Sequence, residues 1–236
     1  MSLLSVGDIK PLHLADVTLP AGTPRAGEVC PVYGFVVTHP AGAVVVDTGI
    51  GEGQPGIEAL YRPVRRPLAE HLSALKIAPA DVVLVINTHL HFDHCGDNRL
   101  FPGTPVLVQR AEYEAAQESA YTVPDWVNFP RARFQLLDGE AEALAGVTII
   151  PTPGHTPGHQ SVLLTTSDGP VIIAGQAAYT AEEYSNPERP HLRGLEMAWD
   201  RKKCLESLQR LRGLGPRLVY FSHDPTIWEA ERPMAG

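Results

Sequence analysis

One short stretch of this chain is unusually rich in side chains that bind metals. Residues 88–96 read Thr-His-Leu-His-Phe-Asp-His-Cys-Gly, so four donors fall within six positions: His89, His91, Asp93 and His94. An apolar, largely β-branched run at residues 82–86 precedes them and is typical of a buried strand. The donors are therefore expected in a loop at a strand end, and imidazole and carboxylate groups bind zinc and similar metals.

The spacing of these donors predicts two neighbouring ions rather than one. Residues two apart in an extended segment point to the same side, so His89 and His91 are expected to bind one ion together. Asp93 and His94 must then face elsewhere, which suits a second ion close by. The competing interpretation is a polar loop with solvated histidines, and the density of donors disfavours it.

The pattern His-x-His-x-Asp-His resembles the signature of the metallo-β-lactamase superfamily. The resemblance implies a third donor for the first metal, and His155 in the sequence Pro-Thr-Pro-Gly-His takes that place. It also implies a last donor for the second metal, which is His223 after the apolar run 218–221. His159 is expected to be structural in such proteins. Asp47, in Asp-Thr-Gly, is expected to orient the donors, although a plain turn carboxylate explains it equally well.

One position departs from the family pattern. The superfamily usually has an aspartate that bridges the two metals after the strand at residues 171–174, and this chain has Gln176 there. An amide oxygen is a neutral ligand and cannot supply the charge that helps to hold two dications together. Three outcomes stay open: two metals bridged by hydroxide alone, one tight and one weak metal, or a catalytically degraded site.

Tyr179, three residues after Gln176, indicates a branch of the superfamily. The sequence Ala-Ala-Tyr-Thr at this offset resembles the N-acyl homoserine lactonases, in which such a tyrosine binds the lactone carbonyl oxygen; a half-buried packing tyrosine is the alternative. The resemblance implies a hydrolase with one or two zinc ions, or manganese, iron or cobalt. It implies ring opening by metal-bound hydroxide, with Tyr179 stabilising the oxyanion and Asp93 protonating the leaving alkoxide.

The fold implied by the resemblance is an α+β structure, an αβ/βα four-layer sandwich formed as one domain by residues 1–236. Apolar patterns predict strands at residues 32–38 and 43–47 and at 105–109, and amphipathic helices at 66–76, 111–120 and 197–212. A further helix is expected to begin near Asp97. The aromatic segment 121–133 is expected either to form an apolar rim for a substrate or to be a packed surface loop.

Composition narrows the partners and the location. The net charge is −8 without basic clusters, which argues against nucleic-acid or membrane surfaces. Three widely spaced cysteines and the lack of a signal-like or membrane-spanning apolar run make the cytoplasm the expected location. The expected partner is a small lactone, with a homodimer left open.

Alternative functions stay open within the same fold. One is a different ester or thioester hydrolase, such as a glyoxalase II-like enzyme. Another is a metal-binding homologue whose catalysis is impaired by Gln176. A nuclease is disfavoured by the acidic balance of the chain, and a β-lactamase by the lack of an export signal.

Overall fold

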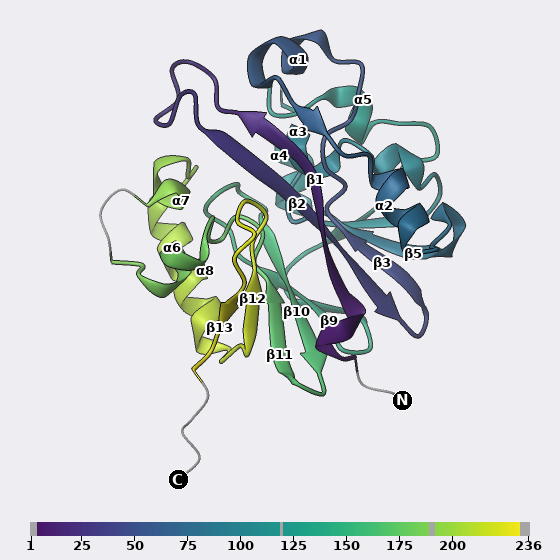
Figure 1. The fold of residues 1–236 in the computed structure, drawn as a ribbon, viewed down its shortest axis with the longest axis vertical. Helices are drawn as coiled ribbons and strands as arrows, with labels where there is room; N and C mark the ends of the chain where they lie inside the picture. The colour runs from purple at the N-terminus through teal and green to yellow at the C-terminus, as the bar shows by residue number, and fades with distance from the viewer. Residues whose placement is uncertain (1–3, 119, 189–191, 232–236) are drawn as a thin grey trace.

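Two mixed β-sheets face each other in the computed structural model, which describes residues 4–118, 120–188 and 192–231 (Figure 1). The first sheet has the strand order β4-β1-β2-β3-β5-β6-β7. Its strands are β1 (Ile9–Thr18), β2 (Val29–His39), β3 (Gly42–Val46), β4 (Val64–Arg65), β5 (Val82–Ile86), β6 (Pro105–Gln109) and β7 (Arg133–Leu137). The second sheet has the order β13-β12-β11-β10-β9-β8. Its strands are β8 (Ala141–Leu144), β9 (Val147–Pro151), β10 (Gln160–Thr166), β11 (Gly169–Ile173), β12 (Leu218–Tyr220) and β13 (Trp228–Glu229).

Helices cover the outer faces of both sheets. Those that accompany the first sheet are α1 (Pro55–Tyr61), α2 (Leu68–Ala74), α3 (Phe92–Cys95), α4 (Arg110–Ala115) and α5 (Pro124–Val127). Those that accompany the second sheet are α6 (Ala181–Ser185), α7 (Arg193–Glu196) and α8 (Arg201–Gly213). The order helix, sheet, sheet, helix confirms the expected α+β four-layer sandwich. No helix in the described ranges is long and apolar enough to cross a lipid bilayer.

Alternation of side chains along the central strands explains why the layers form. In β3, Val44 and Val46 belong to the buried cluster between the sheets, whereas Val45 belongs to the cluster under the helices of the first sheet. Successive side chains of a strand point to opposite faces, so an apolar residue at every position lets one strand serve two cores. Ile172 in β11 likewise faces the helix side while its neighbours face the other sheet.

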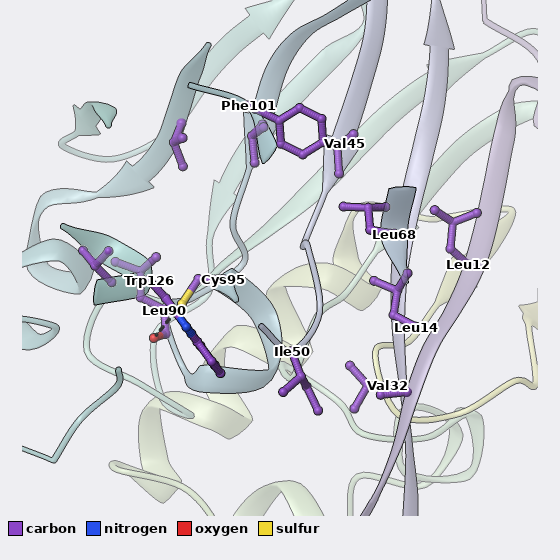
Figure 2. Packing of buried hydrophobic residues seen from close by; sticks show 14 of the residues in the cluster. Leu12, Leu14, Val32, Val45, Ile50, Leu68, Leu90, Cys95, Phe101 and Trp126 are labelled. Atoms are coloured by element: carbon purple, nitrogen blue, oxygen red, sulfur yellow. Dashed lines mark hydrogen bonds between the residues drawn. The ribbon is translucent and has the colours of Figure 1, made fainter. Parts of the chain in front are cut away.

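The outer cluster of the first sheet connects the core to the loop that follows β5. Leu68 and Leu72 of α2 are almost fully buried in it, and each such side chain contributes about 1.5–3 kcal/mol by leaving water. Leu90 and Cys95, from the stretch rich in donors, belong to the same cluster and are labelled with Trp126 in Figure 2. The donors therefore project from a loop whose apolar residues are anchored in the core.

The predicted helices differ from the observed ones mainly at their ends. The helix expected to begin near Asp97 is only a single 3-10 turn, at Asn98–Leu100, with Asp97 as its N-cap. The prediction missed α3, which begins at Phe92 inside the donor stretch. The helix expected at 111–120 ends at Ala115. The helix expected from Met197 begins at Arg201, because the side chain of Asp200 accepts a hydrogen bond from the Lys203 amide at 3.1 Å and caps it.

Candidate metal centre

The candidate metal centre lies where strands of both sheets end at one edge. In the second sheet β9, β11 and β12 run in the same direction, so their carboxyl ends meet, and they are followed by His155, Gln176 and His223. The donor loop after β5 meets this edge from the first sheet. The backbone N–H of Gln160 donates to the Thr88 carbonyl oxygen at 2.8 Å and joins the two sheets there.

The structure brings the predicted donors together as two groups of three. His89, His91 and His155 form the first group, and Asp93, His94 and His223 form the second. Within each group the potential donor atoms lie within 4.8 Å of one another. The division between them is the one expected from the two-residue spacing in the donor loop.

Several polar atoms at this edge are buried without a hydrogen-bond partner among the described residues. They are Nε2 of His89, Nε2 of His94, Nδ1 of His155, Oε1 of Gln176 and the hydroxyl of Tyr179. Buried polar atoms without partners are costly, and their convergence here indicates that the site is built around something else. Imidazole nitrogens, one carboxylate and an amide oxygen suit a divalent metal of the zinc type, so the side chains present fit such an ion.

Neighbouring groups orient the donor imidazoles. Asp47 accepts hydrogen bonds from the Thr88 amide at 2.7 Å and from Nδ1 of His94 at 2.8 Å, so Nε2 of His94 is directed into the site. The Thr88 hydroxyl donates to Asp47 at 2.7 Å and lies 3.1 Å from Nδ1 of His89. Nδ1 of His223 donates to the Pro31 carbonyl at 2.7 Å. These contacts leave the Nε2 atoms available and give Asp47 the orienting geometry expected of it.

Burial and charge set the protonation of the donors. Burial lowers the pKa of His91 and of His223 to about 4, and it lowers the pKa of His89 and His155 well below the usual value. These imidazoles are therefore neutral near pH 7, as metal ligands must be.

His94 differs from the other histidines of the site. Burial alone would lower its pKa, but the carboxylates of Asp93 and Asp47 overcome this and raise it to about 10. The pKa of Asp93 stays below its usual value, because His94 and His223 outweigh the opposing effect of burial. The second group therefore favours a positive charge at the Nε2 of His94, whether the cation is a proton or a metal.

Gln176 and His159 are linked next to the two groups. The backbone N–H of Gln176 donates to Nε2 of His159 at 2.9 Å, while Nδ1 of His159 lies 2.9 Å from the Thr152 hydroxyl. Both ring nitrogens of His159 thus have protein partners, in keeping with the structural role expected for it. Gly175 adopts a φ of +60°, and a Cβ there would lie 2.7 Å from Nε2 of His159, so this turn requires glycine.

A cavity of about 470 Å³ opens over both donor groups. The polar side chains on its floor are His91, Asp93, His155, Gln176, Tyr179 and His223. Its walls are largely apolar and come from β1, α1 and the segment that begins at Ala120. The rings of Tyr179 and His223 are stacked, with their centroids 5.2 Å apart. Burial raises the pKa of the Tyr179 hydroxyl well above its usual value, so the hydroxyl keeps its proton and can donate a hydrogen bond.

Part of the aromatic segment 121–133 lines the cavity, and part of it is packed in the core, so each of the two interpretations holds for some of its residues. Tyr121 lines the cavity, as a rim residue would, and its ring lies 4.9 Å from that of His91. Trp126 and Phe129 are buried away from the cavity, at 1% and 7% exposure. Helical or strand periodicity cannot separate these roles in a segment rich in turns.

The sequence patterns did not indicate three residues that matter at this site. Tyr61 of α1 lines the cavity and contacts Phe92, with ring centroids 4.3 Å apart. Arg193 lines it from α7 and pairs with Glu28 at 2.6 Å. Glu112 of α4 is fully buried beneath the donor loops. Each lies far along the chain from the donors, and no local motif marks it.

The sequence matches the family model of the metallo-beta-lactamase superfamily over residues 27–223. An N-acyl homoserine lactonase of Bacillus sp. is 35% identical over 210 residues, which cover 82% of this chain and 81% of that protein. The N-acyl homoserine lactonase AttM of Agrobacterium fabrum is 32% identical over 226 residues, which cover 84% and 83%.

Solved structures agree with this placement. The crystal structure of a quorum-quenching N-acyl homoserine lactone lactonase superposes with a TM-score of 0.79 at 28% identity, covering 95% of this chain and 94% of that chain. An N-acyl homoserine lactone hydrolase with the product N-hexanoyl-L-homoserine at its catalytic metal center gives 0.79 at 27% identity, covering 95% of each chain. The chain belongs to the metallo-beta-lactamase superfamily, and within it the chain is similar to the N-acyl homoserine lactonases.

Proposed function

We propose that this protein is a metal-dependent hydrolase that opens the lactone ring of N-acyl homoserine lactones or closely related lactones. The observation that carries the proposal is the shared lining of the cavity, where His155 of the first donor group and His223 of the second lie beside the ring of Tyr179, with ring centroids 5.8 Å and 5.2 Å from it. The apolar walls suit an acyl chain, and the similar lactonases support the choice of substrate.

We propose zinc as the metal, with His89, His91 and His155 holding one ion and Asp93, His94 and His223 the other. Manganese, iron and cobalt accept the same donors. Gln176 takes the place of the aspartate that usually bridges the metals in this superfamily, and its neutral side-chain oxygen has no hydrogen-bond partner among the described residues. The proposal therefore does not require two tightly held ions. Bound here, such a metal supplies Lewis acidity for activating water and polarising a carbonyl.

The side chains of this chain then have distinct tasks. Tyr179 donates a hydrogen bond to the carbonyl oxygen as that oxygen gains negative charge, which is an oxyanion-hole role. Asp93 takes the proton that the attacking water loses and returns it to the alkoxide oxygen that leaves when the ring opens. The apolar walls hold the acyl chain and exclude bulk water. The product is a ring-opened hydroxy acid.

The direct test is hydrolysis of N-hexanoyl homoserine lactone, followed by a pH indicator, with the protein as purified and after addition of zinc, cobalt or manganese. We expect acid release from the lactone to be faster than hydrolysis of an acyl-glutathione thioester or a p-nitrophenyl ester. A preference for the thioester would replace the lactonase proposal with a glyoxalase II-like one. Metal binding without hydrolysis of any ester would identify a homologue impaired by Gln176.

Replacing Tyr179 with phenylalanine tests its proposed role. Loss of one oxyanion donor typically lowers kcat by about 10²-fold or more, and we expect that fall with little change in KM or in metal content. Tyr184→Phe is the matched control, because the Tyr184 hydroxyl is also buried without a hydrogen-bond partner among the described residues. Its ring packs beside Phe221 and Trp228, away from the cavity. Equal losses in the two variants would contradict the role of Tyr179.

We further propose that residues 1–236 form a single hydrolase domain that acts in the cytoplasm on a small lactone, without nucleic-acid or membrane partners. Cys30, Cys95 and Cys204 are buried free thiols, which suits a reducing compartment. The net charge of −8 disfavours binding to phosphate backbones. A homodimer is compatible with this function.

A further inference from the structure

Glu112 is a charged residue in an unexpected place. It lies in the first turn of α4, directly after β6, and its side chain has no solvent exposure. No lysine or arginine in the described part of the chain forms an ion pair with it. Burying a carboxylate without a cation is costly unless hydrogen bonds satisfy its oxygens, so the hydrogen bonds of Glu112 must supply that compensation.

Four donors satisfy the two carboxylate oxygens. Oε1 accepts from the Leu90 amide at 2.8 Å and from the Tyr121 hydroxyl. Oε2 accepts from the Thr156 hydroxyl at 2.6 Å and from the Gly158 amide at 3.2 Å. Two of the four are backbone N–H groups, which can only donate, so the site is shaped for a carboxylate rather than for an amide.

Three of these four donors come from the two loops that supply the first donor group. Leu90 lies between His89 and His91, and Thr156 follows His155 directly. The loops belong to different sheets, after β5 and after β9, and one carboxylate spans both. The contact is tight, because a Cβ at Gly158 would lie 2.1 Å from the Glu112 backbone nitrogen.

A fourth contact extends the arrangement to the substrate cavity. Tyr121, which donates to Glu112, lines the cavity and lies with its ring 4.9 Å from that of His91. The carboxylate thus fixes a cavity wall relative to the histidines as well as fixing the histidine loops relative to each other.

We propose that Glu112 is a positioning residue that sets the spacing between the His89–His91 loop and the His155 loop, and thereby the metal affinity of the first donor group. The proposal deepens the function proposed above and rests on it for its catalytic meaning. It differs from a purely structural role, in which Glu112 would stabilise the fold without affecting metal affinity.

The test is the Glu112→Gln variant, with metal affinity measured by chelator competition and stability by thermal unfolding. Glutamine has one acceptor oxygen and one NH₂ group, which cannot accept from either backbone amide, so one loop loses its backbone bond. Loss of a group that orients metal ligands typically lowers metal affinity 10–100-fold, and we expect the zinc affinity of the first donor group to fall by about that factor.

Glu183→Gln is the matched control. Glu183 is also a buried carboxylate that accepts from backbone amides, those of Tyr179 and Arg193. Among the described residues it makes no hydrogen bond to either loop of the first donor group. We expect Glu183→Gln to lose comparable stability and to keep wild-type zinc affinity. Wild-type zinc affinity in Glu112→Gln, together with a similar loss of stability, would overturn the proposal.

Thr156→Val keeps the test decisive if Glu112→Gln does not fold. It removes one of the four bonds and leaves the carboxylate in place, and we expect zinc affinity to fall severalfold; unchanged affinity would refute the positioning role. The readout does not involve a substrate. A wild-type protein that binds zinc but opens no lactone would therefore refute the lactonase proposal while the Glu112 comparison still stood.

Discussion

The His91→Ala variant is expected to lose metal from the first donor group and to lose lactone turnover by about 10³-fold or more, because the Lewis acid that activates water is no longer held. Among the described residues the first group consists of three donors, and removal of one leaves two histidines on different loops. Metal per chain, measured by elemental analysis after gel filtration, and initial rates of ring opening check the two expectations together.

His39→Ala is the control for this variant. His39 ends β2, and its ring lies 3.1 Å from the Ala145 carbonyl oxygen, in neither donor group. We expect that variant to keep its metal and its rate. Turnover that survived in His91→Ala would exclude a mechanism that depends on the first donor group, even if lactones proved to be substrates.

The second large effect is expected from Gln176→Asp, which adds a carboxylate beside the two donor groups. Asp93 is the one carboxylate among the six grouped donors, so two dications there are poorly compensated in charge. A negative oxygen at position 176 should raise the affinity for the more weakly held ion by about tenfold or more and move the metal content towards two per chain. Chelator competition and elemental analysis measure both quantities.

Gln176→Asn separates charge from shape in this experiment. Asparagine matches aspartate in size but is neutral, so the argument from charge predicts a gain in the aspartate variant alone. If both variants bind metal alike, side-chain length rather than charge limits the second ion. If wild-type protein already holds two ions tightly, Gln176 is compatible with a complete centre.

The local sequence predicts the four candidate donors between His89 and His94, because they follow an apolar strand, whereas His155 and His223 are expected from the resemblance to the family. The donor stretch 89–94 follows β5, and the apolar run 218–221 ends two residues before His223. Parallel strands end at the same edge of a sheet, so residues that follow such strands lie close together in the folded protein even when they are far apart in the sequence. The division into two groups followed from the two-residue periodicity of extended chain.

The residues that support the donors could not be predicted in the same way. Glu112 falls in a helical pattern where an acidic side chain normally faces water, and only the packing of α4 beneath two distant loops buries it. The start of α8 was missed because the Asp200 cap outweighs an apolar pattern that extends back to Met197. Long-range packing decides the burial of Glu112 and leaves no local mark, whereas the Asp200 cap is a local signal, three residues from the amide that it accepts from.

The segments that form the cavity walls are separate from those that supply most of the donors. The walls include residues of β1, of α1 and of α7, and none of these elements carries a residue of either donor group. We therefore expect substitutions at Leu60 in α1 or Leu19 after β1 to change which acyl groups fit while the candidate donor histidines stay in place. Because the two sets of residues are separate, substitutions in the cavity walls can alter substrate preference during evolution while the residues that carry out the reaction are retained.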